Sequence, residues 1–167
     1  MLNIIAGLPG TGKSTIAKHL QKKISGSIIL SRDDLMEKLF KPAIYGSKEQ
    51  KDKTFEKMLS LADSYIKEGK NVILEMPFSH QTEILVAKHV AFVNKEKFNI
   101  LLCSCSDETS LKRITLQKKT HKAGDRDKKL YFDVKSRFDS IKEKHKIINT
   151  DLPLPECINE CLSYLKR

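Results

Sequence analysis

The sequence predicts an α/β fold in which helices cover both faces of a parallel β-sheet. Three observations lead to this class. Five short and nearly all-apolar runs are spread along the 167 residues, segments with helical periodicity separate them, and a glycine-rich turn joins the first run to the first helix. Parallel neighbours require crossover connections, and strands covered on both faces contain few polar residues. At this length we expect a single domain, residues 1–167.

The first elements alternate regularly between strand and helix. Leu2–Ala6 is an apolar run ended by Gly7, which indicates a buried strand. Apolar residues recur at helical spacing over 14–24, and Ser27–Leu30 is the second apolar run. Asp33 and Asp34 open a short helix that we expect to reach about Phe40, ahead of Pro42.

The middle and the end of the chain continue the pattern. Ser47 is placed to cap a long helix that ends before Gly69, and the third strand, Val72–Leu74, is followed by Glu75. The remaining expected elements are a helix over 80–94, a strand over Phe98–Ser104, helices over 107–119 and 129–146, a strand at Ile147–Ile148 and a helix over 155–166. The polar segment 120–129 is expected to be a loop or a mobile lid.

Composition excludes several classes of protein. With 40% hydrophobic and 31% charged residues, the chain is not expected to be disordered. No apolar run approaches the roughly 20 residues of a membrane span, and the N-terminus does not resemble a signal peptide. Four cysteines, as the pairs Cys103/Cys105 and Cys157/Cys161, are expected to be buried core residues rather than disulfides or zinc ligands. A reduced, cytoplasmic protein without a membrane partner is expected.

The positive charge is unevenly distributed along the chain. The formal net charge is +10, and residues 101–150 hold 13 Lys and Arg against 7 Asp and Glu. Such a cluster is typical of proteins that bind nucleotide phosphates or a nucleic-acid backbone, and a solvated lysine-rich surface is the alternative. A nucleic-acid partner is therefore possible on charge alone.

The most specific motif lies between the first strand and the first helix. The residues Gly7, Leu8, Pro9, Gly10, Thr11, Gly12, Lys13 and Ser14, followed by Thr15, match the P-loop pattern G-x-x-x-x-G-K-[ST]. Glycines allow successive backbone N–H groups to converge on a phosphate, and the helix N-terminus adds partial positive charge. Lys13 is placed for the β- and γ-phosphates, and the Ser14 hydroxyl is a hard ligand suited to Mg²⁺. The motif predicts ATP and Mg²⁺ binding.

Other sequence features narrow the kind of P-loop protein. A GTPase would normally carry an Asn/Thr-Lys-x-Asp element, and the nearest segment, 94–97, lacks the Asp. An AAA+ motor would need a much longer chain and an Asp-Glu pair at the end of the third strand, where only Glu75 stands. A small phosphotransferase similar to the nucleoside-monophosphate kinases remains.

Three stretches together extend the match beyond the P-loop: Gly7–Thr15, Leu30-Ser31-Arg32-Asp33-Asp34-Leu35 and Asn71–Glu75. In this order the chain resembles the polynucleotide 5′-kinase and zeta-toxin-like group of P-loop kinases. The resemblance implies a three-layer P-loop NTPase fold with a five-stranded parallel sheet in the order 2-3-1-4-5. It also implies that a small basic helical lid, about 107–129, closes over ATP. It further implies that Asp33 is the general base that contacts the acceptor hydroxyl.

The chain departs from that group at three positions. Where polynucleotide kinases place an Arg that contacts the acceptor phosphate, three residues after the catalytic Asp, this chain has Met36. A second Arg expected in the lid is Gln117. The Asp of the third strand is replaced by Glu75, a longer carboxylate that can still hold a Mg²⁺-bound water.

The side chains themselves suggest roles for the remaining candidates. Asp33 follows a strand at the sheet edge where ligands bind, so it can take a proton from an acceptor, or it can simply cap the next helix. Phosphoryl transfer also needs cations at the equatorial oxygens, and Arg113 and Arg126 are the best lid candidates because a guanidinium can contact two oxygens. Each of these lid residues can equally be a solvated surface cation.

The sequence therefore predicts an ATP-dependent kinase that transfers the γ-phosphoryl group to a hydroxyl of a nucleic-acid 5′ end or a small molecule. The predicted catalytic residues are Lys13, Asp33, Arg113 and Arg126, and the predicted metal residues are Ser14 and, through water, Glu75. The alternative is an ATP-binding or ATP-hydrolysing regulatory module associated with RNA or tRNA modification. A toxin-type kinase acting on an amino-sugar nucleotide is a third possibility.

Overall fold

The sheet is parallel and has five strands, as the sequence predicts. The computed structural model describes residues 1–117 and 127–166. The strands are β1 (Leu2–Ala6), β2 (Ser27–Ser31), β3 (Asn71–Glu75), β4 (Phe98–Ser104) and β5 (Lys146–Asn149), and their spatial order is β2-β3-β1-β4-β5. This is the order that the family resemblance implies. Ile5 of β1 pairs with Glu75 of β3, and Ser31 of β2 also pairs with Glu75, so these strands end level with one another.

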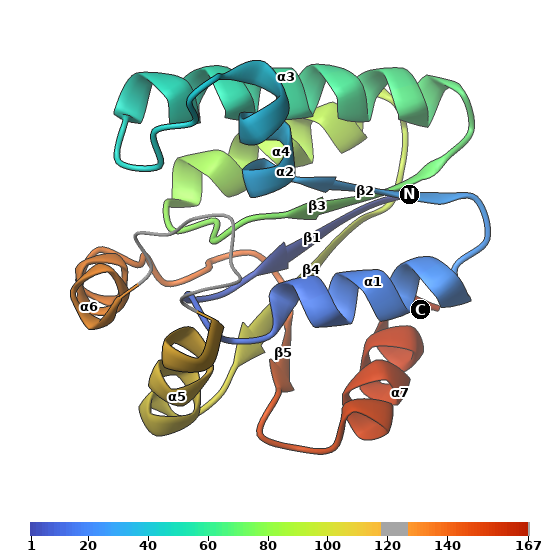
Figure 1. Cartoon of the computed structure of the whole chain (residues 1–167). Helices are drawn as coiled ribbons and strands as arrows, with labels where there is room; N and C mark the ends of the chain where they lie inside the picture. Colours follow the sequence, from blue (N-terminus) through green and yellow to red (C-terminus); the bar gives the residue numbers. More distant parts are fainter. Residues whose placement is uncertain (118–126, 167) are drawn as a thin grey trace.

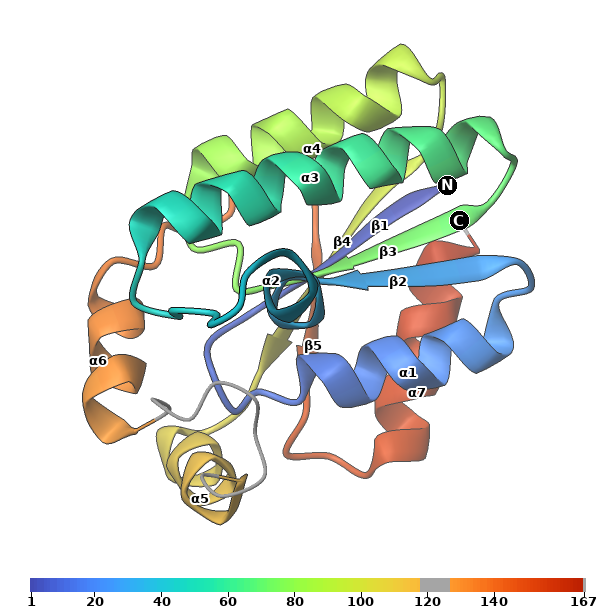
Figure 2. The same ribbon diagram turned by 45° about the horizontal axis from the view of Figure 1, so that its top comes forward.

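Helices form a layer on each face of the sheet, which gives the expected three-layer architecture. Helices α1 (Lys13–Lys23) and α7 (Leu154–Leu165) cover one face, and α3 (Lys48–Lys67) and α4 (Gln81–Val93) cover the other (Figure 1). The short helix α2 (Arg32–Leu39) follows the edge strand β2 and packs on α3 (Figure 2).

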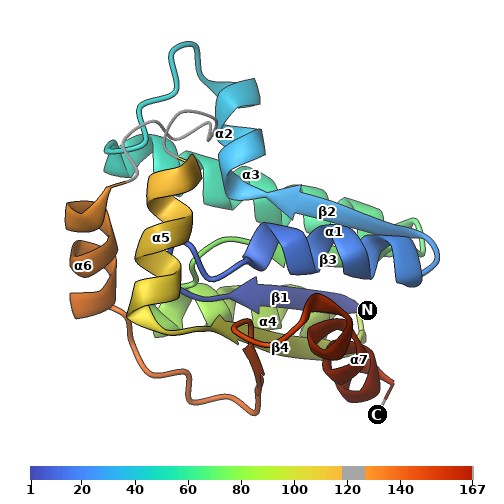
Figure 3. The ribbon, with the colours of Figure 1, turned by 60° about the horizontal axis from the view of Figure 1, so that its bottom comes forward.

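Two further helices stand beyond the carboxyl ends of the strands. Figure 3 shows α5 (Asp107–Gln117) and α6 (Lys128–Ser136) side by side at this end, with both chain termini on the opposite side of the molecule. Residues 118–126, which the sequence analysis assigned to the lid, lie outside the described residues. The residues that come directly after strands β1, β2 and β3 therefore lie at the end of the sheet where α5 and α6 stand.

The alternation of side chains along each strand divides the core into two clusters. Leu2, Ile4 and Ala6 belong to the cluster under α3 and α4, whereas Ile5 belongs to the cluster under α1 and α7. Successive strand residues point to opposite faces, so a strand with apolar residues at both kinds of position supplies both cores at once. All the residues of β1 are buried, which is the physical reason why they are apolar except Asn3, whose side-chain oxygen accepts a hydrogen bond from the Asn99 side chain at 2.8 Å.

Cysteine burial and the capping of the long helix agree with the sequence. Cys103, Cys157 and Cys161 are buried in the cluster under α1 and α7, and Cys105 is half-buried just past β4. The Ser47 hydroxyl accepts a hydrogen bond from the backbone N–H of Gln50 at the start of α3. Among the described helices, none combines the length and the apolar character that crossing a membrane requires.

The helix expected over 129–146 is wrong in its second half. Helix α6 ends at Ser136, and the chain then runs without regular structure to β5. Tertiary hydrogen bonds replace helical ones: the N–H of Asp139 donates to the Ser79 carbonyl at 2.9 Å, and the Asp139 carboxylate accepts from the N–H of Gln81 at 3.0 Å. These bonds tie the segment to the start of α4, a partner that periodicity along the sequence cannot reveal.

Candidate functional site

The loop between β1 and α1 is shaped by glycines in a backbone conformation that other residues rarely adopt. Gly7, Gly10 and Gly12 have φ values of 137°, 81° and 81°. A Cβ at Gly7 would lie 2.3 Å from the Cys103 carbonyl oxygen, and one at Gly10 would lie 2.6 Å from that of Ser110. The loop therefore lies directly against the main chain that follows β4 and against α5, and at Gly7 and Gly10 only glycine fits.

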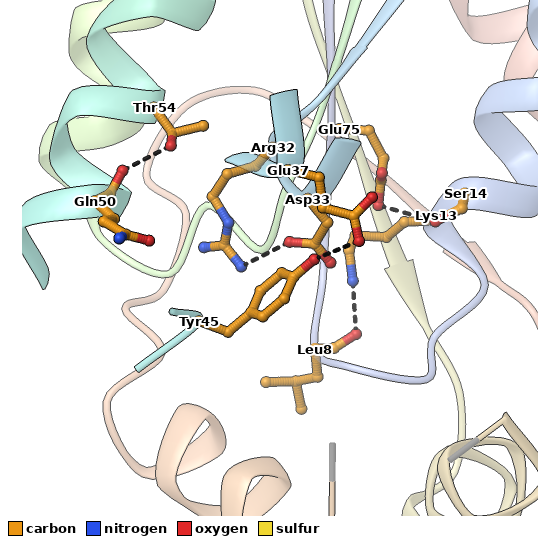
Figure 4. Close-up of polar contacts among 10 residues, drawn as sticks. All are labelled: Leu8, Lys13, Ser14, Arg32, Asp33, Glu37, Tyr45, Gln50, Thr54 and Glu75. Carbon is orange, nitrogen blue, oxygen red and sulfur yellow. Dashed lines mark hydrogen bonds and ion pairs between the residues drawn. The ribbon is translucent and has the colours of Figure 1, made fainter. Parts of the chain in front are cut away.

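The loop also organises its own side chains. The Thr11 hydroxyl donates to the Leu8 carbonyl at 2.8 Å. The Lys13 ammonium donates to the same oxygen at 2.9 Å (Figure 4). Lys13 is only 6% exposed, which places its charge inside the loop rather than in solvent. Helix α1 begins at Lys13, so the N–H groups of its first turn and the Lys13 ammonium lie at the same end of the helix, where an anion can bind.

Ser14 and Glu75, the two residues predicted to serve a metal ion, are brought together by the fold. The Ser14 hydroxyl donates to a Glu75 carboxylate oxygen at 3.2 Å, across 61 residues of sequence. Glu75 is 7% exposed at the end of β3. A hydroxyl beside a carboxylate is a hard-oxygen set of the kind that Mg²⁺ selects, so these residues fit the predicted ion.

Asp33 lies in the first turn of α2, immediately after β2. Ser31 occupies the N-cap position of this helix, so Asp33 is not its capping residue. The Arg32 guanidinium reaches the Asp33 carboxylate at 3.4 Å, and Figure 4 shows Asp33 close to Lys13 and to the ring of Tyr45. Its place beside the P-loop lysine is the one that a proton acceptor for phosphoryl transfer would need.

Two cavities open at this end of the sheet and meet at the same three residues. One, of about 830 Å³, runs along α1 and is lined by Gly12, Ser14 and Thr15. The other, of about 500 Å³, lies between α2, α3, α4 and α6. Both are lined by Lys13, Asp33 and Glu75. The candidate catalytic residues thus stand where the two cavities join, and we name the first the nucleotide cavity and the second the acceptor cavity.

The sequence analysis missed most of the side chains that line the acceptor cavity. They are mainly polar and come from α2, from α3 and from residues next to the ends of α3, α4 and α6: Arg32, Tyr45, Lys48, Lys51, His80 and Arg137. Only Arg32 carried a signal, because it directly precedes Asp33. The others are isolated polar residues without a motif. The fold alone collects them.

Arg113 was expected to be a lid cation, and in the structure it forms hydrogen bonds to the P-loop and to Thr150. Its guanidinium donates to the Thr150 carbonyl at 2.8 Å, to the Thr150 hydroxyl at 3.1 Å and to the Gly10 carbonyl at 3.4 Å. The Thr150 hydroxyl in turn donates to the Thr11 carbonyl at 3.0 Å. Arg113 also lines the nucleotide cavity. Its predicted catalytic role stays a prediction, and that of Arg126 lies outside the described residues.

The position of Met36 agrees with the departure noted in the sequence. Met36 lies on the inner face of α2 and is fully buried, and Lys38, the nearest cation along the chain, is exposed and does not line the acceptor cavity. Neither residue can take the part of an arginine facing an acceptor phosphate. Any cation that serves an acceptor must come from elsewhere in the cavity wall.

One hydrogen-bonded cluster fixes α6 against the start of α5. The buried Tyr131 hydroxyl donates to the Asp107 carboxylate at 2.8 Å, and the Lys135 ammonium contacts the other carboxylate oxygen. The hydrogen bonds from Lys135 and Tyr131 lower the pKa of Asp107. Burial, together with the bond to Asp107, raises the pKa of Tyr131 to about 12. Because α6 carries Val134 and Arg137 into the acceptor cavity, this cluster holds one wall of the cavity in place.

Comparison with known proteins supports the fold. Residues 2–140 match the AAA_33 family, described as "AAA domain". Comparison with curated protein sequences gives no match. Among solved structures, a sugar kinase from a Janibacter species has 15% identity and a TM-score of 0.76, over 99% of this chain and 94% of that one.

Two further structures widen the comparison. The Mycobacterium tuberculosis APS kinase, solved with AMPPNP and APS, has 18% identity and a TM-score of 0.71, over 99% and 97% of the two chains. A gluconokinase from Sinorhizobium meliloti has 14% identity and a TM-score of 0.71, over 99% and 91%. At these identities the likeness concerns the fold, which is that of P-loop kinases.

Proposed function

The chain belongs to the AAA_33 family, and we propose that it is an ATP-dependent kinase that phosphorylates a hydroxyl group of a small molecule. The observation that carries the proposal is the junction of the two cavities at Lys13, Asp33 and Glu75. An enzyme that transfers a phosphoryl group from one ligand to another needs two binding sites that adjoin the same catalytic residues. ATP hydrolysis alone, as in a regulatory module, does not require a second ligand cavity at the same residues.

The proposed reaction assigns each residue a task in one in-line displacement. The acceptor hydroxyl oxygen forms a bond to the γ-phosphorus while the bond from that phosphorus to the β,γ-bridging oxygen breaks, and ADP leaves. Asp33 accepts the hydroxyl proton. Lys13 and the backbone N–H groups of the P-loop hold the phosphoryl oxygens as their charge redistributes. This is an alcohol phosphotransferase reaction.

Magnesium belongs to the proposal through Ser14 and Glu75. Their hydroxyl and carboxylate oxygens are hydrogen-bonded to each other, and both groups line the nucleotide cavity. We propose that Ser14 binds the ion directly and that Glu75 holds it through water. When bound, the ion neutralises charge on the β- and γ-phosphates.

The neighbouring kinases support a small acceptor rather than a nucleic-acid end. The solved structures of similar fold are named as kinases of sugar, APS and gluconate. The acceptor cavity of about 500 Å³ suits a ligand of that size. A 5′-hydroxyl nucleic acid, which the resemblance to polynucleotide kinases implies, is kept as a competing acceptor in the test.

The test follows the label from [γ-³²P]ATP in the presence of Mg²⁺. The acceptor panel contains sugars, sugar acids, nucleosides, aminoglycoside antibiotics, and 5′-hydroxyl RNA and DNA. We expect label on a small-molecule hydroxyl and no transfer by the Lys13→Ala variant. Label that appears only as free phosphate, at the same rate with and without acceptors, would favour the regulatory module instead.

A further inference from the structure

We propose that the acceptor is an alcohol that also carries an oxyanion group (carboxylate, sulfate or phosphate) and that Arg32 is the residue that binds this group. This inference rests on the proposed kinase function and names the chemical class of its second substrate. It starts from Arg32, a residue to which the expected chemistry gives no task. Arg32 opens α2 and lines the acceptor cavity next to Asp33.

The hydrogen-bonding state of Arg32 is the first observation. Its Nε atom is buried and has no hydrogen-bond partner among the described residues. The contact of its Nη2 atom with the Asp33 carboxylate is long, at 3.4 Å. A guanidinium has five N–H donors in a planar fork, and burying a donor without an acceptor is unfavourable. A planar or tetrahedral oxyanion supplies the acceptor oxygens that this fork lacks.

The wider cavity wall is the second observation. Beside Arg32, the acceptor cavity is lined by Lys48 and Lys51 from the first turn of α3 and by Arg137 at the end of α6. Helices α2, α3 and α6, which are far apart in sequence, thus each contribute cations to the acceptor cavity. A site for an uncharged alcohol gains nothing from such a set, because the desolvation of each cation opposes binding of an uncharged group.

The acidic residues of the same wall do not cancel this charge. Asp33 and Glu75 have tasks in the transfer itself, and Glu83 accepts a hydrogen bond from the N–H of His80 at 3.0 Å within its own helix cap. Asp52 is the one further carboxylate among the described lining residues. Among the described lining residues, five cations stand against these four carboxylates, so a small positive excess remains: Lys13, Arg32, Lys48, Lys51 and Arg137.

The position of Arg32 also limits the shape of the acceptor. Arg32 and Asp33 are consecutive residues whose side chains touch, as Figure 4 shows. A hydroxyl held at Asp33 and an oxyanion held at Arg32 must therefore lie within one small molecule. The ring of Phe55 and the side chains of Val86 and Val134 line the same cavity and can contact its carbon skeleton. A sugar acid, or a nucleoside with a nearby phosphate, has this pattern.

The experiment compares matched acceptors that differ only in the anionic group. The pairs are D-gluconate and D-glucose, glycerate and glycerol, and adenosine 3′-phosphate and adenosine, each assayed with [γ-³²P]ATP. We expect kcat/KM to be at least about tenfold higher for the anionic member of the pair that is used. Equal or better transfer to the neutral member would overturn this inference and leave the kinase function standing.

Variants then test the residue. In Arg32→Gln, KM for the anionic acceptor should rise about ten- to hundredfold, while KM for ATP stays unchanged and the neutral counterpart is used as before. Lys57→Gln, an exposed cation of α3 outside the cavity, is the matched control. An equal loss of kcat on both members would make Arg32 a positioning residue for Asp33 and overturn its role as anchor. If Arg32→Gln does not fold, Arg32→Lys, which keeps the charge but removes the planar fork of donors, gives the same comparison.

A binding measurement separates this inference from the proposed function. With AMPPNP and Mg²⁺ occupying the P-loop, sulfate is titrated into the wild type and into Arg32→Gln by calorimetry. Saturable binding that is lost in Arg32→Gln and kept in Lys57→Gln supports the anion site even if no acceptor becomes labelled. The same sulfate affinity in all three proteins would overturn it. Failure of every acceptor in the labelling assay contradicts only the kinase function.

Discussion

The two cavities that meet at Asp33 are built in opposite ways. The nucleotide cavity has one wall made of consecutive residues, Gly12–Lys18, where the backbone conformation of the P-loop glycines sets the shape. Most of its other residues come from β2, α2, β3, α5, α7 and the turn after β5. The acceptor cavity is assembled from side chains of α2, α3, α4 and α6 and the turns before them. The first is fixed by backbone geometry and tolerates little change, whereas the second can be altered residue by residue. Specificity can therefore change on this scaffold while the phosphate site stays the same.

The contrast also appears in what holds each cavity. The P-loop is held by the Arg113 guanidinium and the Thr150 hydroxyl, which donate hydrogen bonds to the backbone carbonyls of Gly10 and Thr11. The far wall of the acceptor cavity is held by side-chain bonds from Tyr131 and Lys135 to Asp107. Both contacts therefore depend on a few side-chain donors, and they differ in their acceptors: backbone carbonyls of the P-loop in the first and the Asp107 carboxylate in the second.

The largest expected effect is on the nucleotide side. Lys13→Ala should lower turnover by about a thousandfold or more, because it removes the buried cation that faces the transferred phosphoryl group. Lys22→Ala, in the last turn of the same helix, is the control and should behave like the wild type. The measurement is the steady-state rate with saturating ATP, with circular dichroism to check the fold. Full activity in Lys13→Ala would remove the basis for the whole assignment.

Asp33 tests the junction itself. Asp33→Asn should lower kcat about 10²- to 10⁴-fold because the amide cannot accept the hydroxyl proton, while the Kd for ATP changes little. Asp34→Asn is the neighbouring control, since Asp34 lines only the nucleotide cavity among the two described. A parallel loss of ATP affinity and rate would assign Asp33 to the nucleotide side and break the proposed division between the cavities.

A substitution of Arg113 tests whether this residue holds the P-loop in place or acts in catalysis. If Arg113 braces the P-loop, Arg113→Gln should raise KM for ATP about tenfold, as the loss of its charged hydrogen bonds to Thr150 and Gly10 lets the loop relax. Lys112→Gln, its exposed neighbour, is the control. A fall in kcat with KM for ATP unchanged would instead support the role at the transferred phosphoryl group that the sequence predicts.

The smallest effect concerns the bracing of the acceptor side. The pKa of Asp107 is lowered in the folded state, so its ion pair adds stability above its ordinary pKa of 3.8, and this stability is lost as pH falls through the lower folded value. Asp107→Asn should therefore lower Tm by a few degrees at pH 7, and the difference should begin to close near pH 3.8 and disappear below the folded pKa of Asp107. Thermal unfolding of the wild type, Asp107→Asn and Asp133→Asn, an exposed control on α6, would measure this. A difference that persists at acid pH would mean that packing, not charge, explains the loss.

The parts that the sequence predicted correctly all depend on local patterns. The five strands were found because strands covered on both faces are mostly apolar, as Ile4, Ile5 and Ala6 of β1 and Val72, Ile73 and Leu74 of β3 show. The P-loop was found because its glycines are required one by one by the backbone path. The end of the expected helix over 129–146 was missed because hydrogen bonds to Ser79 and Gln81, distant in sequence, stop it early.

By itself, then, the sequence determined the fold class, the phosphate-binding loop and the placement of Asp33 and Glu75 at strand ends, because each follows from interactions between residues close along the chain. Only the tertiary structure decided that Ser14 meets Glu75, that Arg113 braces the loop against Thr150, and that Arg32 faces the same space as Lys48 and Arg137. These contacts span tens of residues, and their geometry is set by how the helices pack on the sheet. No pattern along the chain records that packing.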